Sequence, residues 1–507
     1  MTAQSDIAAG YASEGAAIEL GAVLVDGTVE PTARVRLPLA TLNRHGLVAG
    51  ATGTGKTKTL QLIAEQLSAA GVPVVMADVK GDLSGLSRPG EGGERVTERA
   101  TQTGDDWQPQ ACPVQFLSLG TGGAAVPVRA TITSFGPILL SKVLGLNDTQ
   151  ESTLGLIFHW ADSRGLPLLD IKDLRSVIGH LTSEEGKADL KGLGGVSSAT
   201  AGVILRSLVN LEAQGGDTFF GEPELDPRDL MRLVDGRGVV SLLELAELQA
   251  RPALFSTFLM WLLAELFEVL PEEGDLEKPK LVFFFDEAHL LFADASKAFL
   301  ERITQTVKLI RSKGVGVFFC TQLPTDVPNA VLSQLGARVQ HALRAFTPED
   351  QAALAKTVKT YPTTPHYELD EVLTSLGIGE AVVTVLSEKG APTPVAWTRL
   401  RAPRSLMDTI GSDAIKQAAE TSELHGKYAE TVDRESAYEK LTAKVAPPPA
   451  REEAPPREPE RRAEREEPGV VSQVLGNSAV KSFLRSAASA LGREITRGLF
   501  GTSRKRR

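Results

Sequence analysis

The stretch GLVAGATGTGKTKTL at residues 46–60 contains GATGTGKT, which matches the phosphate-binding pattern G-x-x-x-x-G-K-[ST] at residues 50–57. In such a loop, successive backbone N–H groups converge on phosphate oxygens, and the helix that follows adds the partial positive charge of its N-terminus. Leu47 and Val48 end an apolar run, and the apolar residues after Thr57 recur at helical spacing. The sequence therefore predicts a strand, a phosphate-binding loop and a helix in succession.

The residue types in this loop have separate expected roles. The glycines permit positive φ and a close approach of the backbone to phosphate. Lys56 is expected to reach the β- and γ-phosphates and to act in catalysis, and the Thr57 hydroxyl is expected to ligate Mg²⁺. The expected nucleotide-binding residues are Gly50, Ala51, Thr52, Gly53, Thr54, Gly55, Lys56, Thr57 and Lys58.

A second feature is the apolar run LVFFF at residues 281–285, which ends in the carboxylates Asp286 and Glu287. Asp286 is expected to hold Mg²⁺ together with Thr57, and Glu287 to orient and polarise the attacking water. Phosphoryl transfer needs mainly charge neutralisation and an in-line nucleophile, which these residues can supply. The pattern therefore predicts hydrolysis of the nucleotide rather than binding alone, with His289 packing or capping.

Two further apolar runs end in polar residues. Residues 72–77 precede DVKGD at residues 78–82, and residues 314–320 precede Thr321 and Gln322. Ligands gather at the carboxyl ends of strands in open α/β sheets. Residues 78–82 are therefore expected either to face the nucleotide or a neighbouring subunit, or to form an ordinary acidic loop. Gln322 is predicted to sense the γ-phosphate or the attacking water, the alternative being a polar strand end that faces a loop.

Composition narrows the class of protein. With 507 residues and 42% hydrophobic content, the chain is expected to be globular, with two or three units. The formal charge of −10 (54 − 64) argues against nucleic-acid binding by the whole surface, so any DNA site is expected to be local. The two cysteines, Cys112 and Cys320, support neither a disulfide framework nor a zinc site. A reducing cytoplasm is therefore the simplest compartment. Residues 1–15 do not resemble a signal peptide, so export is not expected.

The longest apolar run, at residues 252–270, is predicted to be a buried core helix. Its length nearly suffices to cross a bilayer, but Glu265 and Glu268 cancel the gain from its apolar side chains. No integral membrane segment is therefore expected.

Along the chain, the apolar patterns predict an α/β core interrupted by helices. Residues 85–110, rich in Gly and charge, are expected to form a mobile surface segment. The expected divisions are a short N-terminal β-element (1–45), the first part of the core (46–135), an α-helical insertion (136–232), the second part of the core (233–405), a helical extension (406–445), a disordered linker (446–468) and a basic amphipathic helix (469–507).

The C-terminal region differs in composition from the rest. Residues 446–468 are dense in Pro and mixed charge, which predicts an extended, disordered linker. Beyond it, apolar residues from Val480 to Leu499 trace one helical face, and the chain ends in SRKRR. This helix is expected to dock on a protein partner, DNA or an anionic membrane surface, or to fold back onto the protein's own core.

Four motifs together resemble the HerA/FtsK-type branch of P-loop ATPases, in particular the HerA-like helicases of poorly defined function. They are GATGTGKT, FFFDEAHLL at residues 283–291, TQLP at residues 321–324 and GIGE at residues 377–380. The resemblance spans about residues 20–400. It implies a RecA-like (ASCE) core in which the strand before Gln322 lies between the strand that precedes the phosphate-binding loop and the strand that precedes Asp286 and Glu287. It also implies ATP as the nucleotide and a ring, usually a hexamer, that works on double-stranded DNA.

In such rings an arginine of one subunit completes the neighbour's site. The candidates for this catalytic role are Arg311, which precedes the strand of Gln322, and Arg338 and Arg344, which follow it. Fewer than about fifty residues precede the phosphate-binding loop, which leaves little room for the N-terminal barrel of HerA itself.

The leading hypothesis is a cytoplasmic, Mg²⁺-dependent ATPase that forms a ring and couples hydrolysis to movement on DNA. A second hypothesis is an ATP-controlled switch or scaffold that recruits a protein partner, or the membrane surface, through its C-terminal helix. Negligible turnover despite strong nucleotide binding would favour the second hypothesis.

Overall fold

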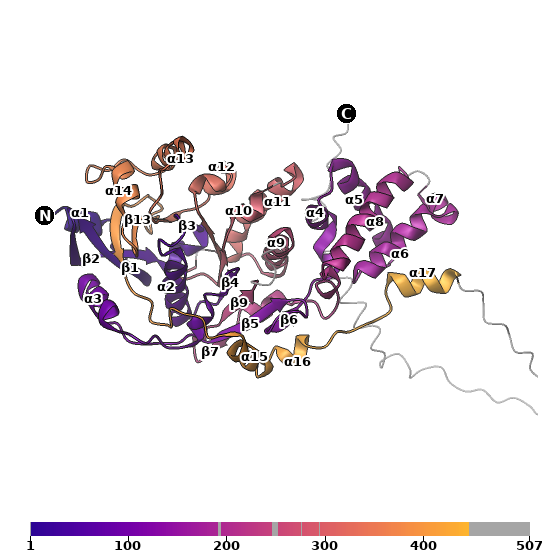
Figure 1. Cartoon of the computed structure of the whole chain (residues 1–507), viewed down its shortest axis with the longest axis horizontal. Coiled ribbons are helices and arrows are strands. Elements are labelled where there is room, and N and C mark those ends of the chain that lie inside the picture. The colour runs from indigo at the N-terminus through magenta and orange to yellow at the C-terminus, as the bar shows by residue number, and fades with distance from the viewer. Residues whose placement is uncertain (1, 191–193, 246–251, 275, 294, 446–507) are drawn as a thin grey trace, which may run out of the picture. The chain divides into compact units, whose positions relative to one another are not determined.

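The computed structural model describes residues 2–445 apart from 191–193, 246–251, 275 and 294. The predicted linker at residues 446–468 and the predicted terminal helix at residues 469–507 lie outside the described residues. The described chain is built around one large sheet with helices on both faces (Figure 1).

The centre of the sheet is parallel, and most of its strands are buried apolar runs, as expected when both faces are covered. In spatial order this part comprises β12 (Ala337–Gln340), β3 (Gly46–Ala49), β11 (Val315–Thr321), β10 (Leu281–Phe285), β4 (Val74–Asp78), β9 (Val240–Glu244), β5 (Val114–Leu119) and β6 (Val126–Val128). The predicted placement of the strand before Gln322 is confirmed, because β11 pairs with β3 on one side and with β10 on the other.

An antiparallel edge continues the same sheet beyond β12. It comprises β13 (Glu380–Thr384), β14 (Ala396–Leu400), β1 (Ala17–Val25) and β2 (Thr28–Pro38). The N-terminal strands are thus part of the main sheet, because β1 pairs with β14 from the far end of the core.

Side chains of each central strand alternate between two hydrophobic layers, as the pleat requires. On β4, Val75 and Ala77 belong to one layer, whereas Val74 and Met76 belong to the other. The first layer is covered by α9 (Pro252–Val269) and α11 (Lys297–Ile310), and the second by α2 (Lys56–Ala69). The apolar run predicted as a buried core helix is confirmed in α9, whose Trp261 and Phe258 are fully buried.

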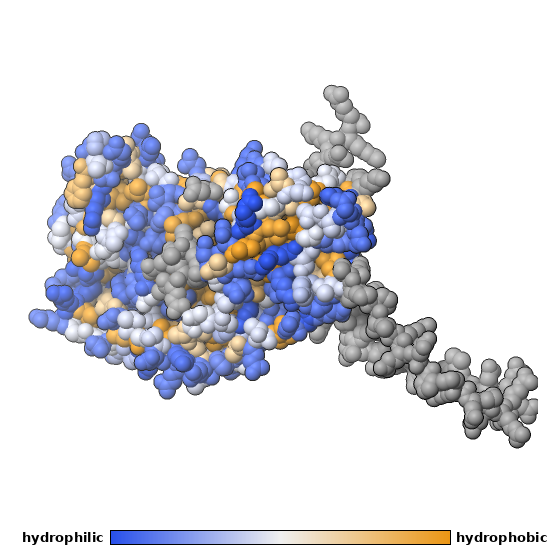
Figure 2. Space-filling view, turned by 45° about the vertical axis from the view of Figure 1, so that its right-hand side comes forward, coloured by the Kyte–Doolittle hydropathy of each residue, from blue (hydrophilic) through white to orange (hydrophobic). Residues whose placement is uncertain are grey.

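No helix in the described part of the chain is long and apolar enough to cross a membrane. On the face shown in Figure 2, apolar residues are interspersed among polar ones.

A group of helices follows β6. It comprises α4 (Ile132–Leu144), α5 (Asp148–Ser163), α6 (Ile171–Thr182), α7 (Glu184–Asp189) and α8 (Ser198–Ala213), labelled together in Figure 1. Capping boxes at Asn147 and Asp170 fix where α5 and α6 begin. The helical pattern predicted for this region is therefore present, while the domain boundaries stay a prediction.

The segment after the sheet packs against both the helices and the sheet. It contains α15 (Ser412–Glu420), α16 (His425–Tyr428) and α17 (Ala437–Val445). The Asp173 carboxylate on α6 accepts hydrogen bonds from the Ser436 hydroxyl, at 2.5 Å, and from the Tyr438 N–H, at 2.8 Å. These bonds anchor α17 to the helical group.

One expectation is wrong. Residues 85–110 do not form a loose surface segment, because they contain the helix α3 (Glu94–Thr103), which is fixed to the sheet. The Arg99 guanidinium on α3 donates to the carbonyls of Gly379, at 3.1 Å, and Leu400, at 2.9 Å. A few long-range hydrogen bonds therefore order a segment whose composition suggests mobility.

The remaining described elements are short or peripheral. They are α1 (Ala3–Ala9), α10 (His289–Phe292), α12 (Asn329–Leu332), α13 (Pro348–Val358), α14 (Leu369–Ser375), the hairpin of β7 (Leu233–Val234) and β8 (Arg237–Gly238), and several single turns of 3₁₀ helix.

Candidate active site

The phosphate-binding loop joins β3 to α2 and has the backbone that its glycines allow. Gly50, Gly53 and Gly55 have φ of 153°, 80° and 110°. A Cβ on Gly50 would lie 2.5 Å from the Cβ of His341, so a larger residue does not fit there. The loop therefore depends on glycine for both conformation and space.

The Lys56 side chain is buried against this loop. Its ammonium donates to the carbonyls of Gly50, at 2.6 Å, and Ala51, at 3.2 Å, while the Thr54 hydroxyl donates to Ala51 at 2.8 Å. Thr57 follows in the first turn of α2, where its backbone N–H is one of those left free by the helix. A positive side chain and free N–H groups thus meet at one point, which suits an anion.

Lys58 is directed elsewhere. It donates to Gln61 at 3.2 Å. Burial lowers the pKa of Lys58, and the carboxylates of Asp82 and Asp408 oppose that shift. The charges that act on Lys58 are therefore those of acidic groups.

Asp286 and Glu287 lie directly after β10, at the same edge of the sheet as the loop. Asp286 is buried and accepts a 2.9 Å hydrogen bond from the Glu287 backbone N–H. Burial, followed by the charge of Glu287, raises the pKa of Asp286. Glu287 has a φ of 48°, an unusual value for a residue with a side chain, which turns the chain sharply after the strand.

Glu287 is held by two neighbours. One carboxylate oxygen lies 2.9 Å from the Lys80 ammonium, and the other lies 3.4 Å from Nδ1 of His289. Burial opposes the charge of Lys80, but its hydrogen bond with Glu287 raises the pKa of Lys80 overall. His289 thus contacts the acid pair and does more than fill space.

Lys80 is positioned by Asp78 at the end of β4. The Asp78 carboxylate accepts hydrogen bonds from the N–H groups of Gly81, Asp82 and Leu83 at 2.7, 3.2 and 2.9 Å. Burial raises the pKa of Asp78 to about 6. Asp78 thus caps its own loop, as the second interpretation of residues 78–82 expects, and Lys80 reaches the acid pair, while contact of this segment with the nucleotide or a neighbouring subunit stays a prediction.

Cys320, near the end of β11, connects the loop to the acid pair. Its thiol hydrogen-bonds to the Asp286 carboxylate, and burial, followed by the charge of Asp286, raises the pKa of the thiol. The charge of Lys56 acts on the same thiol in the opposite direction. The charges of Lys56 and Asp286 therefore both act on this one small buried side chain.

Gln322 is exposed at the end of β11, and its position is fixed by its neighbours. The Asp326 carboxylate accepts from the Thr321 hydroxyl at 2.7 Å and from the Leu323 N–H at 2.9 Å. The side chain of Gln322 is thus presented at the edge where the loop and the acid pair meet.

The three candidate arginines have different surroundings. Arg344 donates to the Thr52 carbonyl of its own phosphate-binding loop at 3.2 Å, and Arg338 donates to the Thr360 carbonyl at 2.7 Å. Arg311 precedes β11, at the opposite edge of the sheet, and its side chain is exposed. Within the described residues, Arg311 makes no side-chain hydrogen bond or ion pair.

Sequence reasoning missed two buried groups at this edge. The His341 ring contacts the Thr59 hydroxyl on α2 at 2.9 Å, and burial, followed by the charge of Lys56, lowers its pKa to about 4. Glu244, at the end of β9, pairs in register with Asp78. Burial and the Asp78 charge raise the pKa of Glu244 to about 8. Glu244 ends the apolar run VVSLL at residues 239–243, the same signal that identified Asp286, whereas His341 follows the mixed sequence ARVQ and carries no such signal.

The sequence profile of the helicase HerA-like C-terminal family matches residues 25–507. The chain belongs to this family. The resemblance drawn from the motifs is thereby confirmed, and with it membership of the P-loop ATPases. No curated protein sequence gives a significant match.

Solved structures agree with the HerA-like fold. The bacterial conjugative coupling protein TrwB, in its unbound form, is 16% identical, with a TM-score of 0.52 over 81% of this chain and 95% of that one. TrwB in complex with ADP and Mg²⁺ is 15% identical, with a TM-score of 0.51 over 79% of this chain and 94% of that one. TrwB in complex with a non-hydrolysable ATP analogue is 15% identical, with a TM-score of 0.50 over 78% of this chain and 99% of that one. At this identity the likeness shows the fold, which confirms the predicted α/β, RecA-like core.

Proposed function

We propose that this HerA-like chain hydrolyses ATP with Mg²⁺ and couples hydrolysis to movement along double-stranded DNA as a ring, in the leading case a hexamer, in the cytoplasm. One observation carries the hydrolytic part: Lys56, after the loop that follows β3, and the Asp286–Glu287 pair, which follows β10, lie at the same edge of the sheet, and β3 and β10 flank β11. The nucleotides in the TrwB structures, including ADP with Mg²⁺, support the choice of ligand.

The donor set fits a magnesium nucleotide. Residues 50–58 offer N–H groups and the Lys56 ammonium to phosphate, and Thr57 and Asp286 offer oxygen atoms to Mg²⁺. Asp286 is buried beside the charge of Glu287, so a bound cation would favour its ionised form. When bound, Mg²⁺ would neutralise charge on the phosphates.

The side chains have separate roles in the proposed reaction. The Lys56 ammonium leaves the carbonyls of Gly50 and Ala51 and binds phosphate oxygens instead, and Glu287 orients a water for in-line attack. Gln322 lies between these two groups in strand order and is suited to contact the γ-phosphate or that water.

Ring formation and DNA rest on the family description, which names a helicase. For a contribution from a neighbouring subunit, Arg311 is the best of the three arginines. A guanidinium that acts on another subunit must be free in its own, and Arg338 and Arg344 are already bound to carbonyls of their own chain.

The test is steady-state ATP hydrolysis with and without double-stranded DNA, for the wild type, Glu287→Gln and the control Glu371→Gln. Glu371 is an exposed acid on α14, so its variant should behave as wild type. We expect Glu287→Gln to bind ATP normally and to lose turnover by about 10²-fold or more. Equal, slow hydrolysis by all three would refute the catalytic assignment.

The comparison of hydrolysis with and without double-stranded DNA separates the two functional hypotheses. Stimulation by DNA supports a motor, and turnover that ignores DNA leaves an ATPase with another client. Tight ATP binding with negligible turnover by the wild type would instead favour the ATP-controlled switch.

A further inference from the structure

The two most exposed large apolar side chains in the described part of the chain are Phe346, 85% exposed, and Ile378, 75% exposed. The other exposed large apolar side chains lie between 37% and 56%. Leaving such surface in water is unfavourable, by roughly 25 cal/mol per Å². Two such side chains beside the phosphate-binding loop indicate that a ligand covers them.

Phe346 ends a segment that runs along the phosphate-binding loop. The His341 N–H donates to Ala49 at 2.7 Å, and the Ala51 N–H donates to Ala342 at 2.8 Å. Two residues before Phe346, Arg344 donates to Thr52 at 3.2 Å. The chain therefore follows the loop from β12 until Phe346 leaves it.

Ile378, two residues before β13, lies beside the same phosphate-binding loop. The N–H of the next residue, Gly379, contacts the Thr54 carbonyl at 3.4 Å, and a Cβ on Gly55 would lie 3.5 Å from the nitrogen of Gly379. Phe346 and Ile378 thus emerge beside successive parts of one loop.

The backbone holds both side chains in place. The N–H groups of Phe346 and Thr347 donate to the Asp350 carboxylate at 3.1 and 3.0 Å, within the capping box of α13. A residue before an N-cap often packs on the fourth helical residue, but here that residue is the polar Gln351. The Arg99 guanidinium likewise donates to the Ile378 carbonyl at 3.3 Å. The backbone at both positions is ordered, while the side chains remain exposed.

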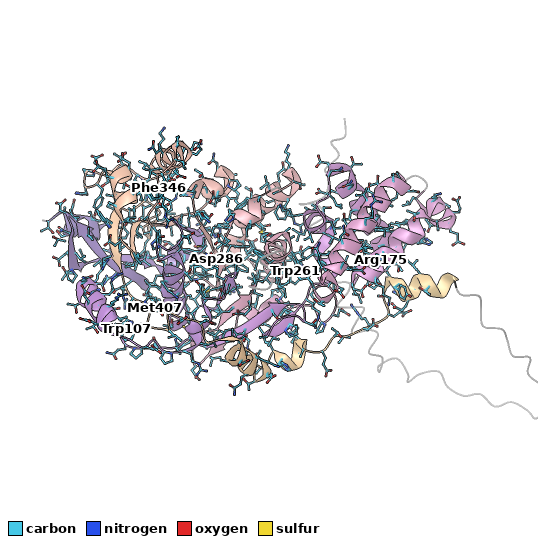
Figure 3. All side chains as sticks on the ribbon, in the orientation of Figure 1. Trp107, Arg175, Trp261, Asp286, Phe346 and Met407 are labelled. Carbon is cyan, nitrogen blue, oxygen red and sulfur yellow. The ribbon has the colours of Figure 1, made fainter. Side chains whose placement is uncertain are left out.

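Strand order gives the direction of the nucleotide. Asp286 and Glu287 follow β10, on one side of β3, whereas Phe346 follows β12, on the other side. In Figure 3 Phe346 lies toward the β13 end of the molecule, away from Asp286. A nucleotide whose terminal phosphate faces the acid pair therefore extends its base toward Phe346.

We propose that Phe346 and Ile378 form the subsite for the base, with the Phe346 ring stacked on the nucleobase and Ile378 closing the apolar contact. The inference rests on the proposed function, because it needs a phosphate group in the loop. Stacking on an aromatic ring suits any nucleobase, since each has a π-face.

The experiment compares a ligand that has a base with one that lacks it. Binding of ADP and of pyrophosphate, each with Mg²⁺, is measured by calorimetry for the full chain. The variants are Phe346→Ala, Ile378→Ala, the conservative Phe346→Trp and the control Leu233→Ala, an apolar side chain 56% exposed on the β7–β8 hairpin.

We expect Phe346→Ala to weaken ADP binding by about 10-fold and Ile378→Ala by a smaller factor, with pyrophosphate binding unchanged. Phe346→Trp should restore ADP binding, and Leu233→Ala should match the wild type for both ligands.

Two results would overturn the subsite while leaving the proposed function intact. One is unchanged ADP affinity in Phe346→Ala, including the case in which sedimentation shows that the variant instead loses contact between copies of the chain. The other is an equal loss of ADP and pyrophosphate binding, which would mean a distorted loop. A wild type that binds neither ligand would overturn the proposed function and the subsite together.

Discussion

Lys80 shows how a single contact can control the proposed chemistry. Its ammonium lies 2.9 Å from Glu287, and it is the cation that the folded chain places against that carboxylate. Without it, Glu287 keeps only the longer contact with His289. We expect Lys80→Met to lower kcat by about 10- to 100-fold, the usual cost of losing a residue that orients a functional group.

The measurement for Lys80 is kcat and KM for ATP, together with ADP affinity. Lys80→Arg, which keeps the charge, should retain more activity than Lys80→Met, and ADP affinity should not change in either. An unaltered kcat in Lys80→Met would show that the ion pair plays no part in turnover.

His341 links the site to pH. Burial lowers the pKa of His341 to about 4, below its ordinary value of 6.5. Between these two values the unfolded chain binds a proton that the folded chain does not, so the stability contributed by His341 is lost as the pH falls from 6.5 toward 4. At pH 5 the loss is about 2 kcal/mol for this one group.

We expect His341→Gln to reduce the fall in thermal unfolding midpoint between pH 7 and pH 5, whatever its effect at pH 7. His159→Gln, at an exposed position, serves as the control and should follow the wild type. If His341→Gln declined in parallel with the wild type, this buried imidazole would not contribute to acid sensitivity.

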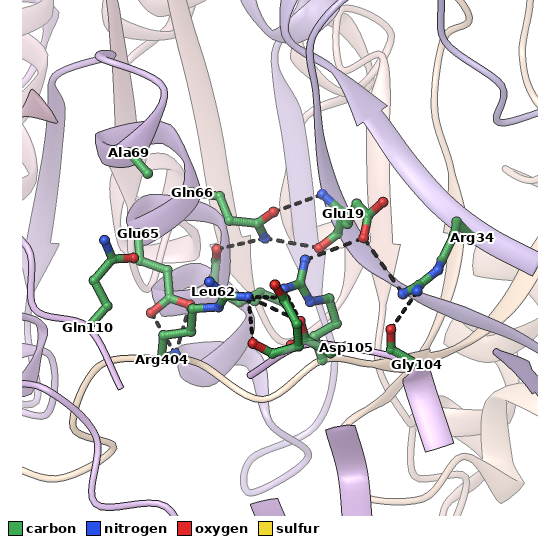
Figure 4. Close-up of a pocket in the computed structure, with 12 residues that line it drawn as sticks. Glu19, Arg34, Leu62, Glu65, Gln66, Ala69, Gly104, Asp105, Gln110 and Arg404 are labelled. Atoms are coloured by element: carbon green, nitrogen blue, oxygen red, sulfur yellow. Dashed lines mark hydrogen bonds and ion pairs between the residues drawn. The ribbon is translucent and has the colours of Figure 1, made fainter. Parts of the chain in front are cut away.

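At the scale of elements, α2 is anchored at a point distant from the phosphate-binding loop. The Glu65 carboxylate accepts a hydrogen bond from the Arg404 N–H at 2.9 Å (Figure 4). It also accepts hydrogen bonds from the Ser405 N–H and hydroxyl at 3.1 and 2.9 Å. The next residue, Gln66, exchanges hydrogen bonds with the backbone of Glu19 on β1. The helix is therefore tied to both the sheet and the segment that follows β14.

We expect Glu65→Ala to lower the free energy of unfolding by about 2–4 kcal/mol, because it leaves several buried N–H and hydroxyl groups without an acceptor. Denaturant unfolding at pH 8 measures this, with the exposed Glu91→Ala as the control. A change below 0.5 kcal/mol, the usual effect at a surface position, would mean that water replaces the carboxylate.

Elements with strong local patterns could be predicted from the sequence. The run at residues 281–285 is β10, and the loop at residues 50–57 lies between a strand and a helix as expected. The position of β11 came from the resemblance, since periodicity does not give strand order. The pairing of β1 with β14 was not predictable, because it joins residues nearly 380 positions apart.

The candidate site divides in the same way. Residues with a motif, such as Lys56 and Asp286, were predictable because their spacing encodes a loop and a strand end. Lys80 and His341 act through contacts made only after folding, and no local pattern distinguishes them from ordinary polar residues. The role of Lys58 in nucleotide binding stays a prediction, and its closest charges are acidic.

At the scale of the whole molecule, the proposed ring requires that each site combine residues of two subunits. If Glu287 acts in its own subunit and Arg311 acts on the neighbour, Glu287→Gln and Arg311→Ala are each inactive alone, and yet each retains the residue that the other lacks. In a head-to-tail ring assembled from equal amounts, about one interface in four then combines both intact residues.

We therefore expect a mixture of the two variants, dissociated and reassembled together, to recover about a quarter of wild-type ATP hydrolysis if the sites act independently. Replacing the Glu287→Gln chains in this mixture by chains that carry both substitutions removes every intact interface and should abolish the recovery. A mixture no more active than the mean of its components would mean that Arg311 acts within its own subunit or not at all. Recovery, in contrast, requires contact between subunits, because no single chain in the mixture holds a complete site.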